Sequence, residues 1–186
     1  MRIPAPPVKQ PLLYRRIDRV RYLLAAARHP ALRGTPMELG QGAHLMIAPD
    51  ARINVGPGFR ARRDLTLVAQ GELNLGKGLF CNRGVVIAAM QSVTIGDDVR
   101  LGERVSVIDS DHVLEPLSDM HARFKEYETK PITIGNRALV SANCVILPGA
   151  QIGDDVVVAA GAVVRGTVPP RTLVAGVPAV VKRELR

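Results

Sequence analysis

Aromatic residues are scarce in this sequence. Phe, Tyr and Trp make up 3% of its 186 residues, and tryptophan is missing altogether. Proteins that bind nucleic acid by base stacking need interleaved aromatic side chains, so this composition argues against nucleic-acid binding. Only two cysteines are present, Cys81 and Cys144, and they suit neither a disulfide framework nor a CxxC metal site. We expect both to be free, buried thiols in a reducing cytoplasm.

Long apolar runs are also missing. The longest one near the N-terminus, residues 23–27, is too short for a transmembrane helix or the core of a signal peptide. Positive charge, by contrast, is in excess, and the formal net charge is +8. Such a surplus indicates an anionic partner, of which nucleic acid, a membrane surface and a polyanionic small substrate are the usual kinds.

What the chain does have is a repeat. A six-residue segment with an aliphatic residue and glycine at its third and fourth positions occurs five times: INVGPG from Ile53, LNLGKG from Leu73, VTIGDD from Val93, ITIGNR from Ile132 and AQIGDD from Ala150. Between these copies, aliphatic residues recur every six positions. The longest unbroken series is Ile134, Val140, Ile146, Ile152, Val158 and Val164. A small or β-branched residue follows most of them four positions later.

A six-residue period fits neither an α-helix nor a single strand, but it is typical of a parallel β-helix built from hexapeptides. The aliphatic residue should point inward and stack on its equivalent in the next coil. We expect the following glycine to supply a positive φ at a tight turn. Carboxylates at the corners are expected to be solvated turn residues, namely Asp97, Asp98, Asp154 and Asp155.

The residues that interrupt the six-residue repeat indicate where a binding site lies. In the early coils two extra residues fall between Leu67 and Leu75 and at the equivalent places, and residues 113–130 interrupt the repeat at that same corner. This long insertion follows His112 in the run SVIDSDH. Loops extruded from a rigid scaffold are common places for binding sites, so we expect a site beside His112.

The stretch ITIGNRALVSANCVILPGAQIGDDVVVAAGAVVRGTVPPRTLVAGVPAVVKRE resembles the hexapeptide-repeat acyltransferases, in the branch of galactoside, maltose and capsule-sugar O-acetyltransferases. The ending PPRTLVAGVPAVVKRE is the most specific part, and the resemblance extends over about residues 71–186. It implies an all-β fold, a left-handed parallel β-helix that forms a homotrimer with active sites between subunits. It also implies acetyl-CoA as the donor, lying along the C-terminal coils.

Three regions are expected from the repeat and the resemblance together. Residues 1–34 form a basic helical segment, residues 35–169 the left-handed β-helix with its extruded loop 113–130, and residues 170–186 a C-terminal tail. The N-terminal helix has an apolar stripe flanked by arginines, made of Leu13, Ile17, Val20 and Leu24. We expect this stripe to pack on protein rather than to hold the enzyme on an anionic membrane.

The family's catalytic histidine corresponds to His112. Transfer of an acetyl group to a sugar hydroxyl needs a base that works near neutral pH, and imidazole, with a free pKa of about 6.5, is suited to it. On the acceptor side the resemblance points to Asn82, whose amide can bind a pair of hydroxyls. Asp109 and Asp111 are expected beside the acceptor as well, where either can orient the imidazole or serve as a turn residue.

The donor side is assigned by the same resemblance. A backbone N–H near Ser141 and Ala142 would stabilise the oxyanion, since the family uses this corner for that purpose. The residues expected to contact acetyl-CoA are Ala159, Ala160 and Gly161 for the pantetheine arm and Arg165, Lys182 and Arg183 for the phosphates. Two departures from the family are visible: Leu139 replaces a tryptophan, and Arg165-Gly166 replaces Thr-Lys.

The sequence therefore predicts an acetyl-CoA-dependent acetyltransferase that acts on a hydroxyl of a sugar or sugar-like acceptor, without a metal. An N-acetyltransferase acting on an amino-sugar nucleotide is an alternative, because it needs the same base and donor. A γ-carbonic anhydrase would need three converging zinc ligands, and the regular coils contain only His112. A purely structural β-helix would need neither the extruded loop nor the tail.

Overall fold

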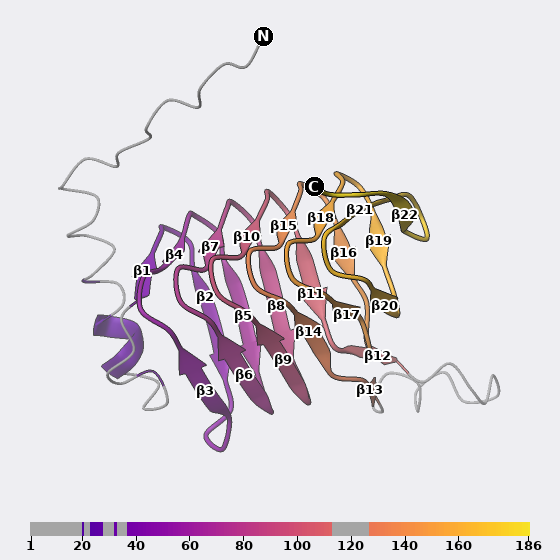
Figure 1. Ribbon diagram of the computed structural model, residues 1–186. Helices are drawn as coiled ribbons and strands as arrows, with labels where there is room; N and C mark the ends of the chain where they lie inside the picture. Colours follow the sequence, from indigo (N-terminus) through magenta and orange to yellow (C-terminus); the bar gives the residue numbers. More distant parts are fainter. Residues whose placement is uncertain (1–19, 21–22, 28–31, 33–36, 113–126) are drawn as a thin grey trace, which may run out of the picture.

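The computed structural model describes residues 20, 23–27, 32, 37–112 and 127–186 of the chain. The main body is a stack of coils with three flat faces, each formed by one sheet (Figure 1). Neighbouring strands within a face are parallel and come from successive coils, except that the C-terminal strand at residues 180–184 pairs antiparallel with the strand before it. The hexapeptide prediction of a parallel β-helix is confirmed.

Each face contains at most one strand from each coil, and the first face also carries the C-terminal strand β22. The first face comprises β1 (Met37–Leu39), β4 (Phe59–Ala61), β7 (Phe80–Cys81), β10 (Arg100–Leu101), β15 (Leu139–Val140), β18 (Val157–Val158), β21 (Thr172–Ala175) and β22 (Val180–Glu184). The second comprises β2 (His44–Ile47), β5 (Thr66–Ala69), β8 (Val86–Ala89), β11 (Ser106–Ile108), β16 (Val145–Ile146) and β19 (Val163–Val164). The third comprises β3 (Arg52–Val55), β6 (Glu72–Leu75), β9 (Ser92–Ile95), β14 (Ile132–Ile134), β17 (Gln151–Ile152) and β20 (Thr167–Val168).

The core is a set of aliphatic ladders that run the length of the stack. On the second face Leu67 pairs in register with Ile87, and Val107 with Ile146, and all four side chains are fully buried. Burying one such side chain contributes about 1.5–3 kcal/mol to stability. The predicted small residues are buried as well, namely Ala138, Cys144, Ala150, Val156, Ala162 and Val168.

The glycine of the repeated motif has a different role from the one expected. Gly76, Gly96 and Gly135 are not among the residues with positive φ. A Cβ built on Gly76 would instead lie 2.4 Å from the carbonyl carbon of Gly96 in the next coil. The glycine is therefore required because successive coils approach closely, and the positive φ falls two residues later, as at Gly78 and Asp98.

Corner carboxylates form a ladder of their own. Asp97 accepts a hydrogen bond from the backbone N–H of Lys77 (2.8 Å), and Asp154 accepts one from Asn136 (2.7 Å). Asn136 in turn accepts one from the N–H of Asp97 (2.8 Å). These side chains are turn residues, as expected, and they also connect each coil to the next.

Three edges separate the faces. Edge 1 joins the first face to the second, edge 2 joins the second to the third, and edge 3 joins the third to the first. The two extra residues of the early coils, Gln70–Gly71 and Met90–Gln91, lie on edge 2. The long insertion leaves the stack on this same edge, between β11 and β14. The predicted position of the extruded loop is therefore confirmed.

The neck of this loop is ordered. β12 (Ser110–His112) and β13 (Tyr127–Thr129) form an antiparallel pair, in which His112 lies opposite Tyr127. At the other end of the loop the backbone N–H of Lys130 donates to the carbonyl of Asp109 (2.9 Å). The chain thus leaves and re-enters the β-helix at one place.

Most of the predicted N-terminal helix lies outside the described residues, including Leu13 and Ile17. Residues 23–27 are helical, and Ala26 is buried against the core. Val20 and Leu24, the described members of the predicted stripe, are each 55% exposed. The side of the helix that carries Ala26 therefore packs against this chain, and the described residues of the apolar stripe do not. Within the described ranges, no helix is long and apolar enough to cross a membrane.

Candidate active site

Edge 1 carries Asn82, expected to contact the acceptor, the turn expected to stabilise the oxyanion, and part of the expected donor site. Asn82, Ser141 and Ala159 each follow a first-face strand by one residue, so they occupy equivalent positions in different coils. Backbone hydrogen bonds connect these levels: the N–H of Asn82 donates to Leu101, and that of Ser141 donates to Val158. Because coils are spaced by about 4.8 Å, Ser141 lies roughly 10 Å and Ala159 roughly 14 Å along the edge from Asn82.

Asn82 is held by a partner that the sequence did not indicate. Its side-chain Nδ2 donates to Oε1 of Glu103 (2.7 Å), and its Oδ1 accepts from the backbone N–H of Arg83 (3.0 Å). Glu103 stands one residue further along the turn of the next coil. The 21-residue separation is one coil plus one residue, a relation that becomes visible only once the register is known.

The turn at Ser141 and Ala142 offers one backbone donor. The N–H of Ser141 is taken by the carbonyl of Val158 (2.9 Å), which removes it from the expected role. The N–H of Ala142 has no acceptor within the described residues. One coil below, a Cβ on Gly102 would lie 2.7 Å from the nitrogen of Ala142, so glycine is needed there for the close approach of the two turns.

His112 lies on edge 2, at the neck of the extruded loop. Its side chain is exposed, and its ring centroid is 4.6 Å from that of Tyr127, with an angle of 38° between the planes. Tyr127 was not predicted, because only the antiparallel pairing of β12 with β13 places it opposite the histidine. The contact restricts the directions in which the imidazole can point.

The two aspartates before His112 differ from each other. Asp109 is fully buried, and its carboxylate accepts three backbone N–H groups, from Met90 (2.8 Å), Gln91 (2.8 Å) and Ser92 (2.7 Å). In this chain Asp109 thus serves as a turn residue that closes edge 2 of the preceding coil, the second of the two roles that the sequence left open for it. Asp111 is exposed and accepts from the backbone N–H of His112 (2.8 Å).

Edges 1 and 2 of one chain are well separated. The second-face strand between them, β8, has four residues and hence a length of about 13 Å. Asn82 lies before this strand and Met90, the neighbour of Asp109, lies after it. A single small acceptor therefore cannot contact both Asn82 and His112 of the same chain.

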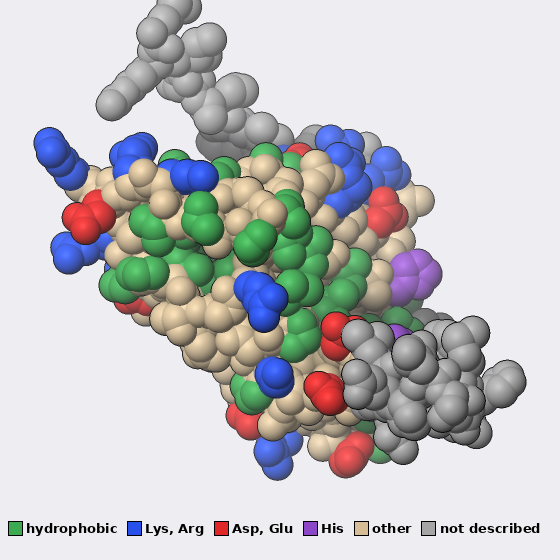
Figure 2. Space-filling view, turned by 90° about the vertical axis from the view of Figure 1, so that its right-hand side faces the viewer, with side chains coloured by type: hydrophobic (Ala, Val, Ile, Leu, Met, Phe, Trp, Pro, Cys, Tyr) green, Lys and Arg blue, Asp and Glu red, His purple; other side chains and the backbone are tan. Residues whose placement is uncertain are grey.

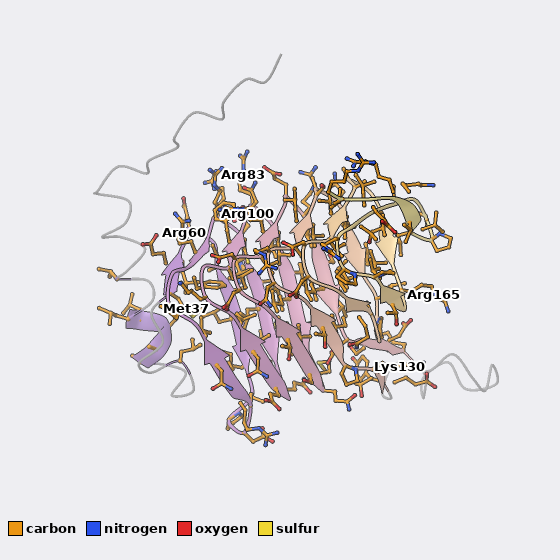
Figure 3. The ribbon with its side chains drawn as sticks, in the orientation of Figure 1. Met37, Arg60, Arg83, Arg100, Lys130 and Arg165 are labelled. Carbon is orange, nitrogen blue, oxygen red and sulfur yellow. The ribbon has the colours of Figure 1, made fainter. Side chains whose placement is uncertain are left out.

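The residues expected to bind the donor are divided between edge 1, edge 2 and β22. Ala160 and Gly161 are exposed on edge 1, and a Cβ on Gly161 would meet nothing within 4 Å, so the surface there is open. Arg165 follows β19 and lies on edge 2 instead, at the C-terminal end of the stack (Figure 3). Lys182 and Arg183 lie on β22, where Arg183 is the register partner of Leu173.

Neither cysteine is suited to carry an acyl group. Burial raises the pKa of the Cys81 thiol to about 12, and burial likewise raises the pKa of Cys144. The sulfur of Cys144 also lies 3.0 Å from the carbonyl of Ala159, to which it donates. The thiolate, which is the nucleophilic form, is thus disfavoured at both positions. In the described part of the chain, no group of three or more His, Cys, Asp or Glu side chains converges as a metal site.

Comparison with known proteins places the chain in a family. The profile of the family "Bacterial transferase hexapeptide (six repeats)" matches residues 131–166. The chain is 36% identical to the lipopolysaccharide biosynthesis O-acetyl transferase WbbJ of Escherichia coli over 141 residues, 72% of each protein. It is 34% identical to the galactoside O-acetyltransferase of that organism over 113 residues, 61% of this chain but only 54% of the relative.

Solved structures agree with this assignment. A galactoside acetyltransferase in complex with coenzyme A superposes with a TM-score of 0.57 and 26% identity, covering 92% of this chain and 82% of its own. The hexapeptide-repeat acetyltransferase VCA0836 of Vibrio cholerae gives a TM-score of 0.59 and 29% identity, with 91% and 81% coverage. The fold is the left-handed β-helix of these enzymes. The chain belongs to the hexapeptide-repeat acyltransferase family, and it is an acyltransferase.

Proposed function

We propose that the protein transfers an acetyl group from acetyl-CoA to a hydroxyl of a sugar or sugar-like acceptor. The observation that carries this proposal is the order of groups along edge 1. Asn82 stands at one end, the unpaired N–H of Ala142 follows, and the open surface at Ala160 and Gly161 lies beyond. The names of the relatives, a lipopolysaccharide biosynthesis O-acetyl transferase and a galactoside O-acetyltransferase, support a sugar hydroxyl as acceptor.

The proposed mechanism needs no acyl-enzyme. His112 removes the proton of the acceptor hydroxyl while its oxygen attacks the thioester carbonyl. The N–H of Ala142 donates to the oxygen on which negative charge develops, a role that needs a fixed donor and not a particular side chain. When the tetrahedral intermediate collapses, the carbon–sulfur bond breaks, and the imidazolium returns its proton to the departing thiolate. The acetyl ester and free CoA are the products.

The active site is proposed to form between subunits of a homotrimer. Since Asn82 and His112 of one chain are separated by a whole face, edge 1 of one subunit would meet edge 2 of the next. The outward side chains of the second face support this arrangement, because most are apolar and half-buried in the single chain: Val68, Val86, Ala88, Ile108, Val145 and Val163. A three-fold axis along this face would bury them and create three equal clefts.

The same arrangement would unite the donor residues. Ala159, Ala160 and Gly161 of edge 1 offer a backbone surface for the pantetheine arm. Arg165, on edge 2, would approach the phosphates from the neighbouring subunit. Lys182 and Arg183 add positive charge on β22, and all three basic side chains are exposed. A guanidinium can pair with two phosphate oxygens at once, so Arg165 can take the place of the lysine found in relatives.

An acceptor screen tests the proposed function. Purified protein is incubated with acetyl-CoA and a panel of sugars, sugar phosphates, nucleotide sugars and amino sugars, and free CoA is followed with a thiol reagent. Release that depends on a hydroxyl acceptor supports the proposal. Release only with amino sugars would replace the ester product by an amide, and no binding of any acyl-CoA would refute the proposal. Light scattering should give three times the mass of the 20.0 kDa chain.

A further inference from the structure

Three arginines surround one phenylalanine on the first face, next to Asn82. The guanidinium carbons of Arg60, Arg62 and Arg100 lie 5.9, 5.7 and 6.0 Å from the centroid of the Phe80 ring. Arg60 and Arg100 are the register partners of Phe80 on β4 and β10, so they stand on either side of it. We call these four residues the arginine cluster.

The three guanidinium groups of the cluster place several positive charges close together on the first face. Within the described residues, none of its three guanidinium groups takes part in an ion pair, whereas Arg52 pairs with Glu72 and Arg137 with Asp155. The nearest acidic residue by register is Glu38, opposite Arg60 on β1. Glu103, one coil above Arg83, is already hydrogen-bonded to Asn82.

Further arginines increase this charge. Arg63, Arg83 and Arg104 lie on the adjoining turns of edge 1, and all three are exposed. Arg63 and Arg104 donate to neutral amide oxygens, those of Gln41 and Asn143, so these contacts remove no charge. Figure 3 shows Arg60, Arg83 and Arg100 near one another, where Arg60 comes from β4, Arg100 from β10 and Arg83 from the turn after β7. Several like charges around one ring repel one another, and an anion bound among them would relieve this repulsion.

The position of the cluster relates it to the proposed acceptor site. Phe80 precedes Asn82 by two residues, and Arg62 is the equivalent of Asn82 one coil below. Arg62 lies one coil from Asn82 on the side that faces away from Ser141 and Ala142, Phe80 lies on the coil of Asn82 itself, and Arg100 lies one coil toward Ser141. An acceptor whose hydroxyl reaches Ala142 and whose ring contacts Asn82 would therefore extend its far end toward the cluster.

We propose that the arginine cluster binds the phosphate or diphosphate of a phosphorylated glycosyl acceptor. This inference rests on the proposed function and adds the chemical class of the substrate. Guanidinium forks match phosphate oxygens in pairs, and several of them around one site suit a group with many anionic oxygens better than a single carboxylate. The Phe80 ring holds the guanidinium groups in place by cation–π contact, which reduces the entropy lost on binding.

Direct binding tests the cluster without requiring turnover. Inorganic pyrophosphate is titrated by calorimetry into the full-length protein with saturating CoA present, so that the donor's own phosphate site is filled. We expect Arg60→Gln and Arg100→Gln each to weaken binding by roughly tenfold to a hundredfold, as for the loss of a charge-assisted contact. Arg52→Gln is the matched control, because it removes an exposed arginine on the third face, and it should leave binding unchanged. Equal binding by all variants, or competition between CoA and pyrophosphate, would overturn the inference.

A second arm separates the inference from the proposed function. In the acetyl-transfer assay, Arg100→Gln should lower kcat/KM for glucose 1-phosphate roughly tenfold or more and leave kcat/KM for glucose unchanged. If neutral sugars are the better acceptors and the variant alters neither, the inference fails while the proposed function stands. If pyrophosphate binding depends on the cluster but no acceptor is acetylated, the proposed function fails while the anion site stands.

The source of the phosphate is distinguished by competition. Uridine diphosphate glucose and farnesyl diphosphate, which represent nucleotide-linked and lipid-linked acceptors, are compared as competitors of pyrophosphate. Either one displacing the probe supports the inference and identifies the carrier. Vesicles of phosphatidylglycerol that bind through the cluster, when neither diphosphate competes, would show a membrane contact instead and overturn it.

Discussion

The side-chain amide of Asn82 donates a 2.7 Å hydrogen bond to Glu103 on the next coil. This contact fixes the direction of the amide that we propose binds the acceptor. We expect Asn82→Ala to raise KM for the acceptor about tenfold, and Glu103→Ala to raise it about two- to tenfold, each with little change in kcat. The double variant should resemble Asn82→Ala alone, because Glu103 acts through Asn82. Additive effects on KM would contradict this relation.

His112→Ala should abolish most turnover without unfolding the protein. Removing a general base typically costs about 10²- to 10⁴-fold in rate. The effect should appear in kcat at saturating acceptor and acetyl-CoA, while CoA affinity measured by calorimetry stays the same. His44→Ala, on β2 at the other end of the second face, is the control and should keep full activity. Near-normal transfer by His112→Ala would remove this residue from the mechanism.

Asp109→Ala should be among the most destabilising substitutions in the chain. It would leave three backbone N–H groups without the buried carboxylate that accepts from them, at a cost of about 3–5 kcal/mol in the free energy of unfolding. Asp111→Ala is the matched control two residues away, and it should cost less than about 1 kcal/mol because the side chain is exposed. Urea unfolding at one fixed protein concentration compares the two. Similar midpoints would show that Asp109 does not close edge 2.

A comparison of Gly76→Ala with Gly58→Ala distinguishes the two reasons for which the coils need glycine, namely the close approach of the next coil and a positive φ. At Gly76 the new Cβ would lie 2.4 Å from the backbone of the next coil, so the coils must move apart, at about 2–4 kcal/mol. At Gly58 φ is +81° and the nearest atom is 3.7 Å away, so only the left-handed conformation opposes alanine, at about 1–2 kcal/mol. Thermal unfolding should rank Gly76→Ala as the less stable variant, and the reverse order would contradict the account of the repeat glycine.

Acid should remove a small part of the stability at edge 3. The hydrogen bond from Arg137 lowers the pKa of Asp155 below its ordinary value of 3.8, so the carboxylate is favoured in the folded state. The contribution is present above that ordinary value and is lost as the pH falls through the lower folded pKa. We expect wild type and Arg137→Gln to differ in Tm at neutral pH and to converge as the pH falls through the lowered pKa of Asp155 in the folded protein. A constant difference across the titration would contradict this.

The β-helix itself could be predicted because aliphatic residues recur at a fixed spacing along the sequence. Ile134, Val140 and Ile146 stand six residues apart, the spacing at which a hexapeptide coil turns each of them inward, and the structure buries all three. The position of the extruded loop followed from the two extra residues at the same edge of earlier coils. Such patterns depend on local spacing, which a sequence displays directly.

Contacts between coils could not be predicted in the same way. The Asn82–Glu103 pair and the grouping of Arg60 and Arg100 around Phe80 depend on register across about 20 residues. The sequence suggests Asp109 as a site residue because it stands three residues before His112, but its carboxylate accepts hydrogen bonds from backbone N–H groups of the preceding coil. The role of the repeat glycine was mistaken for a similar reason, since the close approach involves a neighbour distant in sequence.

The alignment of sites along edge 1 has a consequence for how such an enzyme changes its substrate. Equivalent positions along edge 1 are separated by one coil, a step of about 4.8 Å. Inserting one complete coil between the levels of Asn82 and Ser141 would lengthen the acceptor that fits by one step, with every aliphatic ladder still in register. Deleting one would shorten it. Acceptor length in this scaffold can therefore evolve in whole coils, by duplication or loss of about 18 to 20 residues at a time.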